Sequence, residues 1–133
     1  MDQSTSQKLI ELARNAAENA YCPYSQFPVG AAVVSDGKMY FGCNVENASY
    51  GLAICAERAA IFSAISSGCT MIDAVAIVCP AVDANAPIEE RMPCGACRQV
   101  IAEFGDAKTR IFVDGVGEFS LEELLGHPFK IKK

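Results

Sequence analysis

Three cysteines in two short segments have the residue types and spacing of a zinc site. Cys55 lies in the segment 51–60, and Cys94 and Cys97 lie in a later segment, 93–99. Residues three apart on the first turn of a helix share one face, so Cys94 and Cys97 can bind one ion. Cys55 is the best candidate for the third ligand. Zinc with three protein ligands keeps a fourth position open for water, whereas a closed four-ligand site is usually structural.

Glu57 and Arg58 are two charged residues in a segment that is otherwise apolar. Glu57 is a poor fourth zinc ligand, because two residues along a helix lead almost to its opposite side. Apolar residues on nearly every side of a helix indicate that it is buried. A buried charge needs a partner or a chemical task. An internal ion pair between Glu57 and Arg58 is the structural alternative, and the neighbouring cysteines favour a catalytic role.

These motifs, together with segments 27–32 and 44–51, resemble those of the cytidine deaminase family of small zinc aminohydrolases. The resemblance runs in order over residues 21–104, most of the chain. Related zinc deaminases often have a histidine where this chain has Cys55, so the likeness is to the three-cysteine branch of the family. The resemblance also implies a three-layer α/β/α fold around a mixed sheet of about five strands.

The resemblance implies one zinc ion per subunit, held by Cys55, Cys94 and Cys97. The ion would activate water for attack on C4 of a cytosine ring, and Glu57 would move the protons. Cytidine and deoxycytidine would become uridine and deoxyuridine with release of ammonia, a reaction of pyrimidine salvage. Arg58 would hydrogen-bond the sulfur ligands and offset their negative charge.

The substrate-binding residues also follow from the resemblance. Asn44 and Glu46 would bind the ribose; the alternative is a strand-end turn with a solvated acid. Phe27 would pack beside the nucleoside, and the backbone near Ala56 would bind the ring carbonyl. Tyr50 belongs to the same motif as Asn44 and Glu46 and is expected at the substrate.

Phe129 resembles a late aromatic residue that reaches the pocket of a neighbouring subunit in this family. Homotetramers with pockets at subunit interfaces are usual in the three-cysteine branch, so we expect one here. The segment 81–92 differs from the common family pattern, because it is longer and more charged. This difference affects the expected rim of the pocket.

Length and composition restrict the class of protein. The 133 residues form one domain of ordinary size, and a hydrophobic content of 51% excludes a disordered chain. The net charge of −5 without a basic stripe favours a small neutral substrate over a nucleic acid. No apolar run of about eighteen residues and no signal-peptide core occur, so no membrane contact is expected. Seven cysteines without a secretion signal favour a reducing, cytoplasmic setting.

The hydrophobic pattern predicts alternating helices and strands. The expected helices are 6–20 with a capping box at Ser4, 53–67, a helix ending at Phe104, and a short one starting at Ser120; the expected strands are 29–34, 39–45, 74–79 and 110–113. Asp36–Gly37 between the first two strands predicts a hairpin. The order from residue 39 to 113 predicts parallel pairing, which brings the starts of two helices, and so the three thiols, to one edge of the sheet.

Three competing interpretations remain open from the sequence. A structural zinc module would use Cys43 or Cys79 as a fourth ligand, but it leaves Glu57 and Arg58 without a role. A related aminohydrolase would act on a modified or antibiotic cytosine nucleoside. A deaminase of polynucleotides is disfavoured by the acidic charge.

Overall fold

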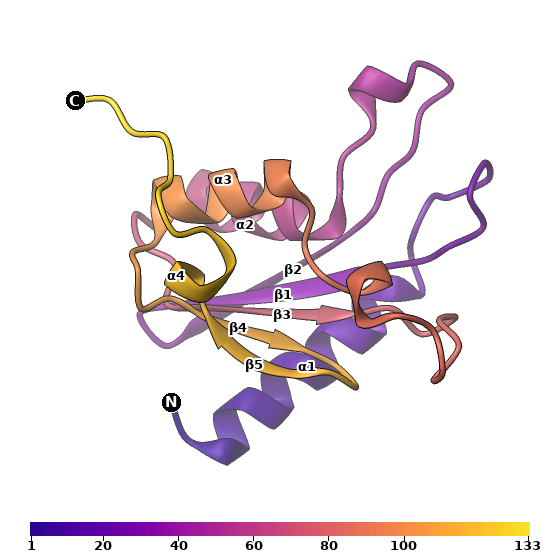
Figure 1. Cartoon of the computed structure of the whole chain (residues 1–133), viewed down its shortest axis with the longest axis horizontal. Coiled ribbons are helices and arrows are strands. Elements are labelled where there is room, and N and C mark those ends of the chain that lie inside the picture. The colour runs from indigo at the N-terminus through magenta and orange to yellow at the C-terminus, as the bar shows by residue number, and fades with distance from the viewer.

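A mixed sheet of five strands forms the middle layer of the computed structural model, which describes residues 1–133 (Figure 1). The strand order is β2-β1-β3-β4-β5. The strands are β1 (Gly30–Ser35), β2 (Lys38–Cys43), β3 (Ala74–Val78), β4 (Arg110–Val113) and β5 (Gly117–Ser120). Only β3 and β4 pair in parallel; the other neighbouring strands are antiparallel.

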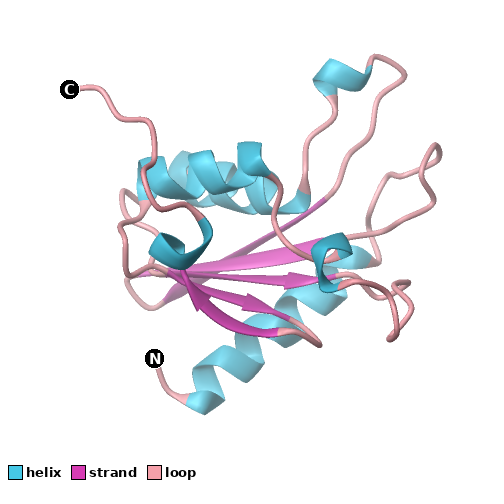
Figure 2. Cartoon of the chain, viewed as in Figure 1, coloured by secondary structure: helices cyan, strands magenta, loops and turns pink.

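Helices cover both faces of this sheet (Figures 1 and 2). The helix α1 (Gln3–Ala17) lies on one face, and α2 (Ala56–Ser66) and α3 (Gly95–Phe104) lie on the other. The short α4 (Leu121–Leu124) follows β5 directly. The predicted three-layer α/β/α architecture is therefore confirmed. None of the helices combines the length and the apolar character needed to cross a membrane.

The central strands divide the core into two halves because alternate side chains of a strand point to opposite faces. Ala31 and Val33 of β1 pack on the side of α2 and α3, whereas Ala32 and Val34 pack on the side of α1. Every residue of β1 and of β3 is buried. This explains why both strands read as continuous apolar runs in the sequence.

The predicted hairpin is confirmed. Val34 faces Met39 and Ser35 faces Lys38 across the β1–β2 pair. Asp36 and Gly37 form the two-residue turn with φ values of 51° and 79°. Positive φ at both positions is the conformation that Asp-Gly favours in tight hairpins.

Three helix boundaries differ from the prediction, and one of them is the end of α1, which lies at Ala17 rather than residue 20. The helix α1 begins at Gln3 rather than residue 6, because the Asp2 carboxylate accepts the Thr5 N–H at 2.8 Å and caps it. Ser4 is therefore inside the helix and starts no capping box. The helix α2 begins at Ala56 rather than residue 53, because Cys55 has extended backbone angles and occupies the N-cap. The capping box at Ser120 is confirmed by the Glu123 carboxylate, which accepts the Ser120 N–H at 2.8 Å.

The predicted parallel pairing is correct for β3 and β4 but wrong for β2 and β3. The strand β1 lies between β2 and β3 and is antiparallel to both, so these two run in the same direction without touching. The chain pattern could not reveal this insertion, because a hairpin can join a sheet on either of its sides. The position of β5 was also missed; it is a four-residue edge strand with no apolar run.

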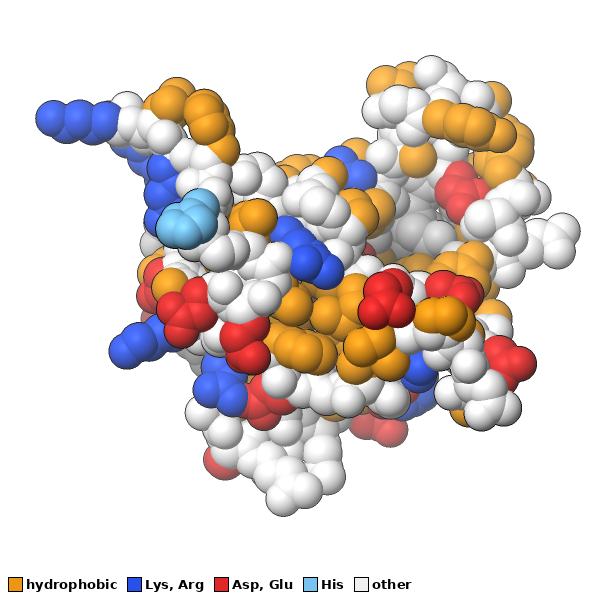
Figure 3. Space-filling model, in the orientation of Figure 1, with side chains coloured by type: hydrophobic (Ala, Val, Ile, Leu, Met, Phe, Trp, Pro, Cys, Tyr) orange, Lys and Arg blue, Asp and Glu red, His pale blue; other side chains and the backbone are white.

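The surface in Figure 3 carries acidic and basic side chains interspersed, with no broad area of Lys and Arg on the face shown. This agrees with the excess of 16 acidic over 11 basic residues. A duplex or a single strand of nucleic acid is normally bound through clustered positive charge. This face of the molecule shows no such cluster of positive charge.

Helix α2 approaches β2 very closely at Gly42. A Cβ atom at this position would lie 2.4 Å from the backbone nitrogen of Ala60 and 2.8 Å from the carbonyl carbon of Ala59. Both neighbours are helix backbone, which cannot move aside like the end of a flexible side chain. Glycine at residue 42 therefore sets the distance between α2 and the sheet.

Replacing Gly42 by Ala should push α2 away from β2 and lower the free energy of unfolding by about 1–3 kcal/mol. Urea unfolding followed by circular dichroism measures this change. Gly126→Ala is a matched control, because a Cβ at Gly126 would meet no atom within 4 Å. Equal destabilisation by the two substitutions would contradict the close approach described above.

Candidate metal centre and active site

The three predicted thiols meet at one edge of the sheet. Cys55 is the N-cap of α2, Cys94 is the N-cap of α3, and Cys97 lies in the first turn of α3. The Sγ atoms of Cys55 and Cys94 are 3.9 Å apart, and those of Cys94 and Cys97 are 3.5 Å apart. All three sulfurs lie within 4.8 Å of one another. The predicted convergence of two helix starts is therefore found in the structure.

The sulfur cluster has the dimensions of a zinc site. Ligands at a Zn–S distance of about 2.3 Å in a tetrahedron are separated by about 3.8 Å, which is close to the two sulfur distances above. No histidine, carboxylate or further cysteine joins the cluster. Cys43 and Cys79 lie outside it, so the four-cysteine structural alternative is contradicted. Three ligands leave one position of the tetrahedron open.

Positive charge surrounds the sulfurs. The N-termini of α2 and α3 meet at the cluster, and helix N-termini stabilise thiolates. The Arg58 guanidinium donates to the Cys55 Sγ at 3.4 Å. A hydrogen bond from Cys97, followed by the nearby Arg58, lowers the pKa of Cys55 to about 5. The pKa of Cys97 is raised, chiefly by its hydrogen-bonding interaction with Cys55 and then by burial.

Glu57 is a buried carboxyl group beside the cluster. Its exposed fraction is 5%, and it lies in the first turn of α2. Burial raises the pKa of Glu57 to about 7, because desolvation disfavours the carboxylate. The structure has no ion pair between Glu57 and Arg58, since Arg58 contacts sulfur instead. The structural alternative of an internal Glu57–Arg58 pair is therefore wrong.

One cavity of about 330 Å³ brings most of the predicted residues together. The predicted residues that line it are Phe27, Asn44, Glu46, Tyr50, Cys55, Ala56, Glu57, Arg58 and Cys94. Ile77 and Cys79 line it from the end of β3, and Glu90, Arg91 and Met92 line it from the charged loop. The size suits a small organic molecule, and the mixture of apolar walls with a few polar groups is typical of ligand sites.

Asn44 holds the chain that carries Phe27. Its Oδ1 accepts the Val29 N–H at 2.9 Å, and its Nδ2 donates to the Phe27 carbonyl at 2.9 Å. These two bonds leave one N–H and one acceptor position of the amide unused, and Asn44 lines the cavity. Asn44 therefore positions a wall of the cavity and keeps polar capacity for a ligand.

Glu46 is held by three hydrogen bonds from the loop before β1. Its Oε1 accepts the N–H groups of Tyr24 and Ser25, each at 3.1 Å, and its Oε2 accepts the Ser25 hydroxyl at 2.5 Å. The Ser25 hydroxyl is the main reason that the pKa of Glu46 is lowered. Glu46 is therefore an oriented carboxylate rather than the freely solvated acid of the alternative interpretation.

Phe129 does not line this cavity within its own chain. Its side chain is 72% exposed, and its carbonyl accepts the Gln99 Nε2–H at 2.9 Å. Two cavity-side residues had not been singled out from the sequence. Arg91 is buried in the wall, and only the charge of segment 81–92 pointed to it. Ser25 had no sequence signal of its own, because serine in a loop is common.

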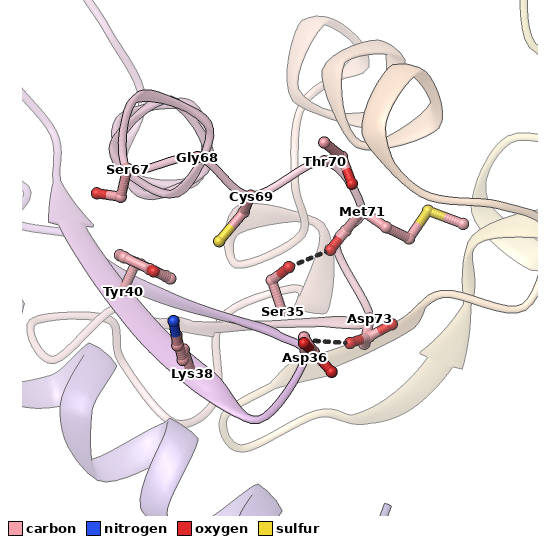
Figure 4. Close-up of a pocket in the computed structure, with 10 residues that line it drawn as sticks. All are labelled: Ser35, Asp36, Lys38, Tyr40, Ser67, Gly68, Cys69, Thr70, Met71 and Asp73. Atoms are coloured by element: carbon pink, nitrogen blue, oxygen red, sulfur yellow. Dashed lines mark hydrogen bonds between the residues drawn. The ribbon is translucent and has the colours of Figure 1, made fainter.

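A second hollow, of about 440 Å³, lies at the opposite end of β3 (Figure 4). Its wall includes the end of α2 at Ser67 and Gly68 and the start of β3 at Asp73. The Ser35 hydroxyl donates to the Met71 carbonyl, and the Asp73 carboxylate accepts the Asp36 N–H. These two polar groups are occupied by local bonds, and the three thiols that could hold a metal ion lie at the other end of the sheet.

The sequence matches the family model described as "Cytidine and deoxycytidylate deaminase zinc-binding region" over residues 3–113. A cytidine deaminase of Halalkalibacterium halodurans is 45% identical over 128 residues, which are 92% of each chain. A cytidine deaminase of Sporosarcina psychrophila is 47% identical over 108 residues, which are 80% of this chain and 75% of the relative.

The fold matches solved structures as well. The crystal structure of a cytidine deaminase from Burkholderia pseudomallei superposes with a TM-score of 0.83 at 45% sequence identity. The superposition covers 97% of this chain and all of the other. The sulfur cluster therefore lies within the part of this chain that matches the zinc-binding family model.

Cys94→Ser should abolish stable zinc binding, because it removes one of the three thiolate ligands and leaves only Cys55 and Cys97. Metal analysis of the purified protein measures this, with Cys69→Ser as the control at the opposite end of the sheet. A chelator should lower the unfolding temperature of the wild type and of Cys69→Ser but not that of Cys94→Ser. Full zinc content in Cys94→Ser would contradict the assignment.

Proposed function

Because this chain belongs to the family of cytidine deaminases and removes the amino group of cytidine by hydrolysis, we propose that Cys55, Cys94 and Cys97 hold one zinc ion per subunit. The same reaction would convert deoxycytidine to deoxyuridine. The main support is the meeting of three sulfurs and the buried Glu57 in one cavity. Bound zinc supplies a Lewis acid that makes water a better nucleophile near neutral pH.

Glu57 is the proposed proton carrier. It takes a proton from the attacking water and gives it to N3 of the cytosine ring. It then takes the second proton from the new hydroxyl group on C4 and delivers it to the departing amine, which leaves as ammonia. Burial beside the sulfur cluster supports this role, because water cannot easily replace the carboxyl group as proton donor. The free N–H groups at the start of α2, near Ala56, would bind the ring carbonyl.

Arg58 is proposed to control the charge of the site. Three thiolates around a divalent ion carry a net negative charge, which weakens the ion as a Lewis acid. The contact of Arg58 with the Cys55 sulfur withdraws part of that charge, and the two helix N-termini act in the same direction. This arrangement supports water activation in spite of an all-sulfur donor set.

The opposite end of the cavity is the proposed sugar site. A carboxylate accepts hydrogen bonds but donates none, so Glu46 suits the hydroxyl groups of a sugar. Asn44 lies beside it with free polar capacity, and Phe27 packs against the nucleoside. Tyr50 is 81% exposed and stands at the rim. Phe129 would complete the pocket of a neighbouring copy.

A homotetramer in the cytoplasm is the proposed working form, with a role in pyrimidine salvage. Exposed apolar side chains support burial against other copies. They include Val45 at 46%, Tyr50 at 81% and Leu52 at 66% on the arm between β2 and α2, and Phe62 at 42% on α2. This arm projects from the body of the molecule, and apolar side chains gather on it in Figure 3. Projecting apolar surface of this kind usually marks an interface.

Glu57→Gln should lower kcat on the order of 10³-fold while zinc content and fold are kept, because the amide cannot carry protons. Ammonia release from cytidine and metal analysis are measured on the same preparation. The matched control is Glu90→Gln, since Glu90 lines the same cavity at its exposed rim. Undiminished ammonia release by Glu57→Gln would remove Glu57 from the mechanism.

Rates on cytidine, deoxycytidine, cytosine and CMP, measured side by side by the ultraviolet change, should separate the nucleosides from the other two compounds. Cytosine lacks the sugar contacts, so its kcat/KM should be lower by about tenfold or more. CMP would bring its phosphate toward Glu46. The alternative function, deamination of a modified or antibiotic cytosine nucleoside, would require cytidine itself to be a poor substrate.

A further inference from the structure

We propose that Ser25 is a positioning residue that sets the affinity of the site for the sugar by orienting Glu46. This inference rests on the proposed sugar role of Glu46 and goes beyond it, because Ser25 itself need not touch the substrate. Ser25 lies in the loop before β1, far in sequence from the zinc ligands. Its hydroxyl joins two walls of the cavity.

The first link is to the Glu46 carboxylate. Oε1 accepts two backbone N–H groups, from Tyr24 and Ser25, so this oxygen stays in place whatever the side chain at residue 25 is. Oε2 is held by the Ser25 hydroxyl alone, at 2.5 Å. A carboxylate has about four acceptor positions, so three of them are used and the last one lies on Oε2. The Ser25 hydroxyl therefore determines where the free acceptor position points.

The second link is to the segment that carries Phe27. The Ser25 Oγ accepts the Phe27 N–H at 3.1 Å while it donates to Glu46. Between them, Gln26 has a φ of 55°, a left-handed conformation that is unfavourable for a residue with a side chain. Hydrogen bonds on both sides of Gln26 hold this turn. One hydroxyl thus fixes the sugar-binding acid relative to the wall that packs on the base.

The surroundings of Glu46 indicate a neutral partner. A separate hollow of about 280 Å³ shares Glu46, Tyr50 and Ala53 with the lining of the cavity. Its lining residues are Tyr24, Ser25, Glu46, Asn47, Tyr50 and Ala53, with no Lys or Arg among them. A phosphate in this hollow would face a carboxylate without a compensating cation. A sugar hydroxyl, which donates a hydrogen bond, is the group that the free acceptor position on Oε2 fits.

Ser25→Ala should weaken binding only for ligands that carry a ring hydroxyl at C2′ or C3′ of the sugar. The dissociation constant of the product uridine should rise about tenfold, because a charge-assisted hydrogen bond loses its alignment. That of 2′,3′-dideoxyuridine should change less than about twofold, because its sugar has no hydroxyl at C2′ or C3′ that could donate a hydrogen bond to Glu46. Isothermal calorimetry measures both values on the zinc-loaded protein. With cytidine, KM should rise and kcat should stay nearly constant.

Matched variants separate positioning from folding. Ser25→Thr keeps the hydroxyl and should restore the affinity for uridine. Ser63→Ala removes an exposed serine from α2 and should leave the dissociation constants of uridine and dideoxyuridine unchanged. If Ser25→Ala does not fold, Ser25→Cys keeps the volume with a much weaker donor and should show the same selective loss. Equal weakening of uridine and dideoxyuridine, or no weakening of either, overturns the proposal.

Glu46→Ala distinguishes the failure of this inference from the failure of the sugar site itself. If Glu46→Ala weakens uridine selectively and Ser25→Ala does not, only the role of Ser25 is wrong. If Glu46→Ala has no selective effect, the sugar site is misassigned. In the double variant, Ser25→Ala should add little to the loss caused by Glu46→Ala, because both act through the same carboxylate. Additive losses would show that Ser25 acts by another route.

Discussion

The meeting of two helix N-termini on one group of sulfurs is the constraint on which the rest of the structure depends. Three thiolates concentrate negative charge in a small volume, and such a cluster is tolerable only where oriented N–H groups and a guanidinium surround it. Cys55 and Cys94 are both N-caps, so their sulfurs stand where the helix dipoles are strongest. Arg58 adds a formal positive charge at 3.4 Å from Cys55.

This constraint explains features far from the sulfurs. Both helices must begin at the same edge of the sheet, which requires strands of one direction before them, and β2 and β3 provide this even though β1 separates them. The start of α2 must also lie close to the sheet. Gly42 permits a close approach at Ala59 and Ala60, two and three residues after the buried Glu57. The direction of β2 and β3 thus brings the starts of the two helices to one edge, and Gly42 allows α2 to pack closely against the sheet.

Local patterns predicted the elements well and their arrangement less well. The spacing of Cys94 and Cys97, the Asp36–Gly37 turn and the alternation of helix and strand are properties of neighbouring residues, so they could be predicted from the sequence. The insertion of β1 between β2 and β3 depends on which side of the hairpin meets the rest of the sheet. The start of α1 was mispredicted because both Asp2 and Ser4 are suitable N-cap residues, and in the structure the Asp2 carboxylate accepts the Thr5 N–H and caps the helix.

The site shows the same division at the level of side chains. Residues that carry chemistry of their own, such as Glu57 in an apolar helix, conflict with their surroundings and so are visible in a sequence. Residues that act through another group cannot be recognised in a sequence, because their effect depends on a hydrogen bond to a distant part of the chain. Ser25 is 21 residues from Glu46 in sequence and bonded to it in space. The oriented carboxylate at the sugar end therefore depends on a loop residue whose type alone indicates nothing, and only the folded chain reveals it.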